Sequence, residues 1–149
     1  MKNPINQVVI EGPDLSGKTT LYQCIHDKTS YKWNIQDRSS LSMLIHAKLY
    51  GRQEFQHVES LKSELNNLNN IMILLLPKWE VISKRFSERG DEIQNLSSLR
   101  KIYLLFEEAA EEFENFPNVY IIRKEVDGQI TDLLINDMLK YASRSFSKM

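Results

Sequence analysis

The amino-acid sequence predicts an α/β fold in which a parallel sheet of four or five strands is flanked by helices as a three-layer sandwich. One observation behind this prediction is an alternation along the chain. Apolar runs of strand length are followed by stretches whose apolar residues recur every three or four positions, the pattern of strands joined by crossover helices. The other observation is composition. Of the 149 residues, 42% are hydrophobic and 26% are charged, which indicates one folded domain over residues 1–149 with a sizeable core.

Four runs have the length and apolar character of buried strands. The clearest covers residues 71–76 and ends at Pro77, a residue that cannot continue a central strand. In chain order, the predicted strands cover residues 7–11, 33–36, 71–76 and 119–122.

Helical spacing fills the intervals between these runs. Ser39 or Ser40 is the expected N-cap of the second helix, and Gly51 is expected to end it. An Asn-rich segment over residues 66–70 stops the third, whose apolar stripe is Val58, Leu61, Leu65 and Leu68. The other helices are predicted over residues 18–28, 80–89, 96–116 and 130–141, with a polar tail over 143–149. The inner stripe of the longest is Leu99, Ile102, Tyr103, Phe106, Ala110 and Phe113.

Between the first strand and the first helix stands the segment Gly12-Pro13-Asp14-Leu15-Ser16-Gly17-Lys18-Thr19, followed by Thr20. It fits the pattern G-x-x-x-x-G-K-[ST] in the strand–loop–helix setting that binds nucleoside triphosphates. Gly12 and Gly17 permit backbone angles that side chains obstruct, so the loop amides and the helix N-terminus can surround an anion. Lys18 adds an ammonium group for the β- and γ-phosphates, and the Thr19 hydroxyl can ligate Mg²⁺. The segment therefore predicts a P-loop NTPase-type fold with ATP and Mg²⁺ as cofactors, although the motif does not distinguish ATP from GTP.

Charge, cysteine and histidine usage narrow the classes of partner. The formal net charge of −1 gives no support to bulk electrostatic binding of nucleic acid and leaves room only for a local basic groove. The single cysteine, Cys24, is interpreted as a small buried residue of the first helix. The lack of internal disulfides and of a signal peptide favours a cytoplasmic protein. The longest apolar run is far shorter than the ~20 residues of a membrane span, so no membrane partner is expected. His26, His46 and His57 lack neighbouring metal ligands.

Asp37-Arg38 follows the second strand, at the edge where parallel sheets bind their ligands. Asp37 there can hold Mg²⁺ through water or accept a proton from an attacking hydroxyl. Arg38 can clamp an anionic substrate through a bidentate fork. The alternative is that Asp37 caps the next helix and Arg38 is solvated.

A basic cluster marks the segment 84–95 as a lid. Arg85 and Arg89 are four positions apart and share one helix face. Phosphoryl transfer needs cations that arrive on closure, because charge spreads over the transferring oxygens. The alternative is a solvated helix whose cations pair with Glu88 or Glu92.

Asp14 lies within the phosphate-binding segment. A carboxylate beside bound phosphates is unfavourable unless it faces away from them, so Asp14 is expected to face the acceptor. The alternative is that it only forms the turn.

These residues resemble the thymidylate kinase-like branch of the P-loop nucleotide kinases, particularly its short bacteriophage-type members. The resemblance rests on residues 11–20, on Asp37-Arg38-Ser39, and on Arg85 with Arg89-Gly90-Asp91-Glu92. It implies transfer of the γ-phosphoryl group of ATP to a deoxynucleoside monophosphate, dTMP-like. It further implies that Asp14 contacts the deoxyribose hydroxyl and that Asp37 and Arg38 organise Mg²⁺ and the acceptor phosphate. Arg85 and Arg89 would close over the transfer.

The sequence departs from this family between the first helix and the Asp-Arg pair. Typical members have a strand, a helix and an Arg-Glu-Pro-Gly-like segment there, whereas residues 27–36 leave room for one strand only. Part of the usual monophosphate pocket, with its arginine and its base-stacking aromatic, is missing. The acceptor site is therefore expected to be more open or differently built, and a homodimer whose second subunit completes it is one such arrangement.

Three functions remain open at this point. The first is a kinase for a free deoxynucleotide. The second is a kinase for a nucleoside or for a modified base or hydroxyl within DNA, which the shortened pocket favours. The third is a non-enzymatic nucleotide-binding module, against which the intact Lys18-Thr19 pair and the basic lid both speak.

Overall fold

The computed structural model describes residues 5, 7–37, 39–89 and 95–147, with side chains as far as Ser143. The strands within these residues are β1 (Gln7–Glu11), β2 (Ile35–Asp37), β3 (Asn70–Leu75) and β4 (Val119–Ile122). The helices are α1 (Lys18–Lys28), α2 (Ser40–Leu49), α3 (Phe55–Asn66), α4 (Trp79–Arg89), α5 (Leu96–Phe113) and α6 (Gly128–Ser147).

The strands form one parallel sheet in the order β2-β1-β3-β4. On one side, β1 pairs with β2, so that Val8 lies opposite Ile35 and Ile10 opposite Asp37. On the other side, β1 pairs with β3 along its whole length. Because all pairs are parallel, the carboxyl ends of β1, β2 and β3 meet at one edge of the sheet, where ligands of such sheets bind.

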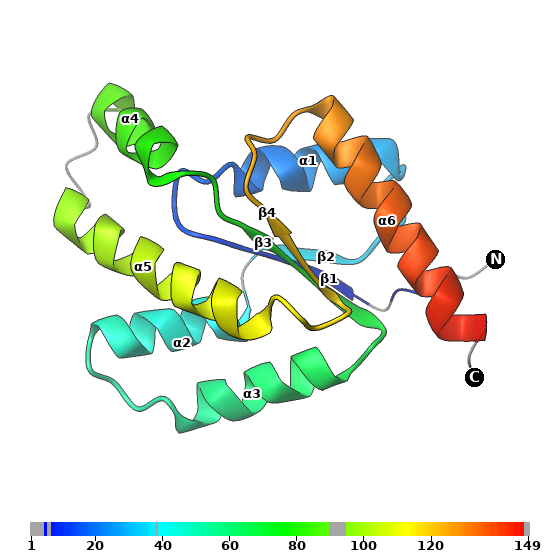
Figure 1. The fold of residues 1–149 in the computed structure, drawn as a ribbon, viewed down its shortest axis with the longest axis horizontal. Helices are drawn as coiled ribbons and strands as arrows, with labels where there is room; N and C mark the ends of the chain where they lie inside the picture. Colours follow the sequence, from blue (N-terminus) through cyan, green and yellow to red (C-terminus); the bar gives the residue numbers. More distant parts are fainter. Residues whose placement is uncertain (1–4, 6, 38, 90–94, 148–149) are drawn as a thin grey trace.

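Helices cover both faces of this sheet. Figure 1 shows α1 and α6 on one face, and α2, α3 and α5 on the other. The side chains of β3 alternate between the two resulting cores. Ile71, Ile73 and Leu75 pack with α1 and α6, whereas Met72 and Leu74 pack with α2, α3 and α5. A strand buried on both faces reads as a continuous apolar run, which is how β3 was recognisable in the sequence.

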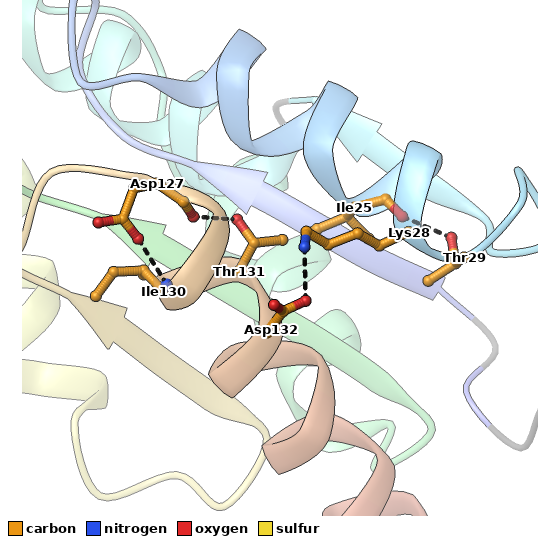
Figure 2. A network of polar contacts seen from close by, with 7 residues as sticks. All are labelled: Ile25, Lys28, Thr29, Asp127, Ile130, Thr131 and Asp132. Atoms are coloured by element: carbon orange, nitrogen blue, oxygen red, sulfur yellow. Dashed lines mark hydrogen bonds and ion pairs between the residues drawn. The ribbon is translucent and has the colours of Figure 1, made fainter.

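Figure 2 shows where the carboxyl end of α1 meets the beginning of α6. The Asp127 carboxylate caps α6 by accepting a hydrogen bond from the Ile130 amide at 2.7 Å. The fully buried Thr131 hydroxyl donates to the Asp127 carbonyl at 2.8 Å. Between the helices, Lys28 Nζ lies 2.7 Å from Asp132 Oδ1. The Lys28–Asp132 contact joins α1, the helix that begins at the phosphate-binding segment, to α6.

Several predicted elements have other bounds in the structure. Strand β3 is Asn70–Leu75 rather than residues 71–76, and α4 begins at Trp79 rather than at residue 80. Strand β2 is Ile35–Asp37 rather than residues 33–36, because pairing with β1 begins at Ile35. Trp33 instead packs, partly buried, on the core beside α1. Helix α3 ends at Asn66, and Asn67 is extended, so the prediction that Leu68 continues the apolar stripe is wrong. Leu68 is 51% exposed.

The carboxyl-terminal helices also differ in length from the prediction. Helix α5 ends at Phe113 rather than at residue 116. Helix α6 begins earlier, at its Asp127 cap, and continues to Ser147, so residues 143–147 are helical where a polar tail was predicted. Leu134, Met138 and Ala142 keep α6 packed on the sheet, which explains its greater length.

Cys24 is half-buried rather than buried, because Leu21 and Ile25 occupy the inner face of α1 and Cys24 lies beside that face. In the part of the chain that the structure describes, no helix is both long enough and apolar enough to cross a membrane.

Candidate functional site

The phosphate loop, residues 12–17, joins β1 to α1 at the carboxyl edge of the sheet. At Gly12, φ is +154°, and a Cβ atom would lie only 2.4 Å from the carbonyl oxygen of Leu75 at the end of β3. The neighbouring backbone therefore excludes any side chain at this position. Gly17 has a φ of +99° and is the N-cap of α1, where no side chain caps the helix. A helix start of this kind presents its amide groups to an anion.

Two side chains complete this cradle. The side chain of Lys18 is buried, and its Nζ donates to the Gly12 carbonyl at 2.8 Å, so the ammonium group lies across the loop. The hydroxyl of Ser16 is buried and has no hydrogen-bond partner among the described residues. A buried hydroxyl without a partner is unfavourable, and a ligand oxygen would satisfy it. The cradle therefore fits the polyphosphate of a nucleotide.

The other residues of the motif have mixed exposure. Pro13 is buried, Asp14 and Leu15 are half-buried, and Thr19 and Thr20 are exposed on the first turn of α1. The Thr19 hydroxyl is thus accessible at the helix start.

The structure brings Arg85 of α4 to the phosphate loop. Its Nη1 donates to the Leu15 carbonyl at 2.7 Å, and its Nη2 lies 3.0 Å from Glu125 Oε1, just beyond β4. The guanidinium group therefore joins the loop to the segment that precedes α6. The alternative of a solvated arginine paired with Glu88 does not apply to this residue.

The rest of the predicted lid is only partly described. Lys84 is exposed and lies 4.0 Å from Glu88, the arrangement expected of a solvated pair. Arg89 is exposed at the end of α4. Gly90, Asp91 and Glu92 lie outside the described residues.

Asp37 ends β2 next to the phosphate loop. It pairs in register with Ile10, two residues before Gly12, and its side chain is exposed. The N-cap of α2 is Ser39, so the alternative that Asp37 caps this helix is not what the structure has. Arg38, the other member of the predicted pair, lies outside the described residues.

The sequence did not indicate the buried carboxylate of Glu11 as part of the site. Glu11, the last residue of β1, has an exposed fraction of 0%. Its carboxylate accepts hydrogen bonds from the amide and hydroxyl of Ser39 and from the hydroxyl of Ser42. Burial raises the pKa of Glu11 above its ordinary value of 4.5, and the hydrogen bonds from Ser42 and Ser39 lower it in part. In the sequence, the only signal was a charged residue at the end of an apolar strand.

A second carboxylate, from α3, reaches the same end of α2. Glu64 accepts hydrogen bonds from the hydroxyls of Ser39 at 3.0 Å and Ser40 at 2.8 Å. We call Glu11, Ser39, Ser40, Ser42 and Glu64 the serine–carboxylate cluster. It connects the end of β1 and the carboxyl end of α3 to the start of α2 at the candidate site.

A cavity of about 330 Å³ opens beside this cluster. It combines hydroxyl, imidazole and guanidinium groups with apolar side chains. Its lining residues are Ser39, Ser42, Met43, His46, Ala47, Arg52 and His57. The cavity was not predicted, because its walls come from α2 and from the connection and first turn of α3, where the sequence carries no motif.

Comparison with known proteins gives matches only at the level of structure. No model of a known protein family matches the sequence, and no curated protein sequence matches it. The YorR protein from Bacillus subtilis, in complex with phosphorylated GDP, has a TM-score of 0.71 at 18% identity, over 91% of this chain and 98% of YorR. Deoxyadenosine kinase from M. mycoides with bound dCTP has a TM-score of 0.60 at 16% identity, over 90% of this chain and 98% of that one. The same kinase with bound dATP has a TM-score of 0.58 at 15% identity, over 90% and 99%.

At these identities the similarity establishes the fold. It confirms the predicted α/β sandwich, with a four-stranded parallel sheet between two layers of helices. The chain therefore shares its fold with YorR and with deoxyadenosine kinase.

Proposed function

We propose that the chain is an ATP-dependent phosphotransferase that moves the γ-phosphoryl group to a deoxynucleoside monophosphate, dTMP-like. The observation that carries this proposal is the phosphate cradle, in which the buried Lys18 ammonium crosses the loop and the Ser16 hydroxyl has no partner among the described residues. Similarity of fold to YorR in complex with phosphorylated GDP, and to deoxyadenosine kinase with bound dCTP or dATP, supports it.

On the donor side, residues 12–20 bind the triphosphate. The loop amides and Lys18 stabilise the charge that develops on the β- and γ-oxygens. Thr19 and Asp37 are the residues that would hold Mg²⁺, since hydroxyl and carboxylate oxygens suit this ion. When bound, Mg²⁺ neutralises phosphate charge.

Cations from α4 act on the transferred group in this proposal. Arg85 already contacts the loop carbonyl of Leu15, so its remaining N–H groups lie close to the phosphates. Arg89, one turn further along α4, and Arg38 complete the set of arginines assigned to closure and to the acceptor phosphate.

The acceptor binds in the 330 Å³ cavity. This volume lies in the range of small-molecule sites, and its lining mixes apolar and polar groups as such sites do. Ser39 lines the cavity and follows Asp37 by two residues, so the acceptor would lie next to the proposed base. Asp14 is assigned to the sugar hydroxyl. The cavity takes the place of the pocket that the short segment 27–36 cannot build.

The test is ADP release from ATP and Mg²⁺ across a panel of deoxynucleoside monophosphates, deoxynucleosides and DNA that contains modified bases. We expect ADP release to depend on added monophosphate and to fall by roughly 10²–10³-fold in Lys18→Ala. Lys62→Ala, which changes an exposed lysine of α3, controls for the charge change. If the protein binds ATP but releases ADP with no member of the panel, the function that remains is that of a non-enzymatic nucleotide-binding module.

A nucleoside kinase is the second candidate. The similarity to deoxyadenosine kinase and the modest size of the cavity both favour it. The same panel separates the two candidates, because a nucleoside kinase releases ADP with deoxynucleosides and not with their monophosphates.

A further inference from the structure

Helix α2 begins without a cap of its own. Ser39 occupies the N-cap position, with extended backbone angles, yet its side chain makes no capping hydrogen bond to α2. The first amide groups of a helix have no partner within the helix and need one from elsewhere. In α2 that partner comes from another element of the fold.

The carboxylate of Glu11 takes over the capping role. Glu11 Oε1 accepts a hydrogen bond from the Ser39 amide, and the Ser42 amide lies 3.4 Å from the same oxygen. These are the N-cap and N3 amides, the two that a capping box would satisfy with two separate side chains. A carboxylate at a helix N-terminus is also favoured by the helix dipole.

We propose that Glu11 is a positioning residue, whose carboxylate caps α2 from β1 and fixes the Asp37 segment relative to the phosphate loop. The kinetic part of this inference rests on the proposed function. Its geometry follows from the chain, because Glu11 directly precedes Gly12, and Ser39 follows Asp37 by two residues. One side chain thus sets the separation between the donor loop and the proposed base.

Glu64 of α3 contributes further hydrogen bonds to the arrangement. It binds the hydroxyls of Ser39 and Ser40, so carboxylates from β1 and from α3 both hold the start of α2. Packing alone does not explain a carboxylate at position 11. The preceding residues of β1, Val8, Val9 and Ile10, are apolar and equally buried, and a buried carboxylate is tolerated only where it is well hydrogen-bonded.

The first test is amide hydrogen exchange without any nucleotide. Glu11→Met keeps a side chain of similar length and removes the acceptor. We expect the Ser39 and Ser42 amides to exchange roughly tenfold faster, as when a helix loses its cap, while the amides of α6 stay unchanged. Glu11→Gln keeps one acceptor oxygen and should restore most of the protection. Unchanged protection of both amides in Glu11→Met would overturn the proposal.

The matched control lies on the same turn of helix. Ser40 and Ser42 are both buried, but only Ser42 donates to Glu11, whereas Ser40 donates to Glu64. If Glu11→Met does not fold, a comparison of Ser42→Ala with Ser40→Ala tests the proposal instead. A larger gain in exchange of the Ser39 amide in Ser42→Ala supports the cap, and equal gains in the two variants overturn it.

The second test separates positioning from a general loss of structure. In Glu11→Met we expect kcat to fall roughly tenfold while the calorimetric Kd for ATP with Mg²⁺ changes less than threefold, with Glu11→Gln recovering most of kcat. Equal losses of kcat and ATP affinity would contradict a positioning role. If the unmodified chain transfers phosphate to no acceptor of the panel, the proposed function is wrong. The exchange experiment still decides whether Glu11 caps α2.

Discussion

The two sides of the candidate site, the phosphate loop and the start of α2, are built in different ways. The phosphate loop consists of consecutive residues whose shape depends on backbone angles and on one close approach, that of Gly12 to Leu75. The start of α2 is held by side chains 24 to 31 positions away in sequence, from α3 and β1. One side is a local motif, and the other exists only once the sheet has formed.

This difference decides what each side tolerates. A loop shaped by its backbone depends on a few residues that cannot change, whereas a cluster of hydroxyls and carboxylates has several partners that partly replace one another. Substitutions in the loop should therefore have large effects and those in the cluster graded ones. Four predictions test this contrast.

The largest effect is expected from Lys18→Ala. The substitution removes the ammonium group that crosses the loop, and loss of one such transition-state contact lowers turnover by roughly 10²–10³-fold. Steady-state kcat with the best acceptor measures it, and circular dichroism checks the fold. Turnover within a few-fold of the unmodified chain would remove Lys18 from its assigned role.

Asp37→Asn is expected to be nearly as damaging. It removes the carboxylate assigned to Mg²⁺ and to the acceptor proton, and loss of a general base lowers turnover by roughly 10²-fold or more. The measurement is kcat over a range of Mg²⁺ concentrations. Asp137→Asn, at an exposed position of α6, is the matched control. Equal kcat in Asp37→Asn and Asp137→Asn at every Mg²⁺ concentration would contradict both roles assigned to Asp37.

Arg85→Ala should have a smaller effect, about tenfold on turnover and less on ATP affinity, because a closing cation acts mainly in the transition state. The control is Arg123→Ala. Arg123 is also an arginine in an ion pair, but its Nη1 lies 2.6 Å from Oε1 of Glu107 on α5 rather than bonding to the loop. Equal losses in the two variants would show that Arg85 acts through stability alone.

The smallest expected effect is a change in the pH dependence of stability, and it concerns Glu11 in the serine–carboxylate cluster. Because burial raises the pKa of Glu11, the folded chain binds this proton more tightly than the unfolded chain does. The contribution of this proton to the stability of the fold is therefore complete below pH 4.5, the ordinary pKa of a glutamate side chain. It is lost as the pH rises through the folded-state pKa of Glu11. Glu11→Gln should flatten this decline in urea unfolding series between pH 4 and 8, and Glu59→Gln, at an exposed position, should not. A decline that is identical in all three proteins would contradict the assignment.

The sequence was sufficient to predict the fold and to locate the phosphate loop between β1 and α1. Apolar runs indicated all four strands, and the spacing of apolar residues on the long helix indicated Leu99, Phe106 and Phe113 as core, where they are buried. Each of these signals is contained within one element. The phosphate loop is likewise a single segment between a strand and a helix.

The rest depended on contacts between elements. No local pattern shows that Glu11 faces α2, since the sequence gives the strand but not the helix that its last side chain meets. The 330 Å³ cavity has the same origin, because its walls assemble from residues between Ser39 and His57. The errors at Leu68 and at the end of α6 arose where packing, rather than propensity, decides how far a helix continues.

The close approach of Gly12 to Leu75 has a consequence for binding. Because the backbone at Gly12 already packs closely against the strand carbonyl, we expect the curvature of the loop here to be preorganised in the chain without nucleotide. A ligand then need not restrict backbone freedom at this point, and the interaction with its phosphates is not offset by the conformational entropy of ordering a flexible segment. Affinity for a polyphosphate should accordingly extend to fragments as small as inorganic triphosphate.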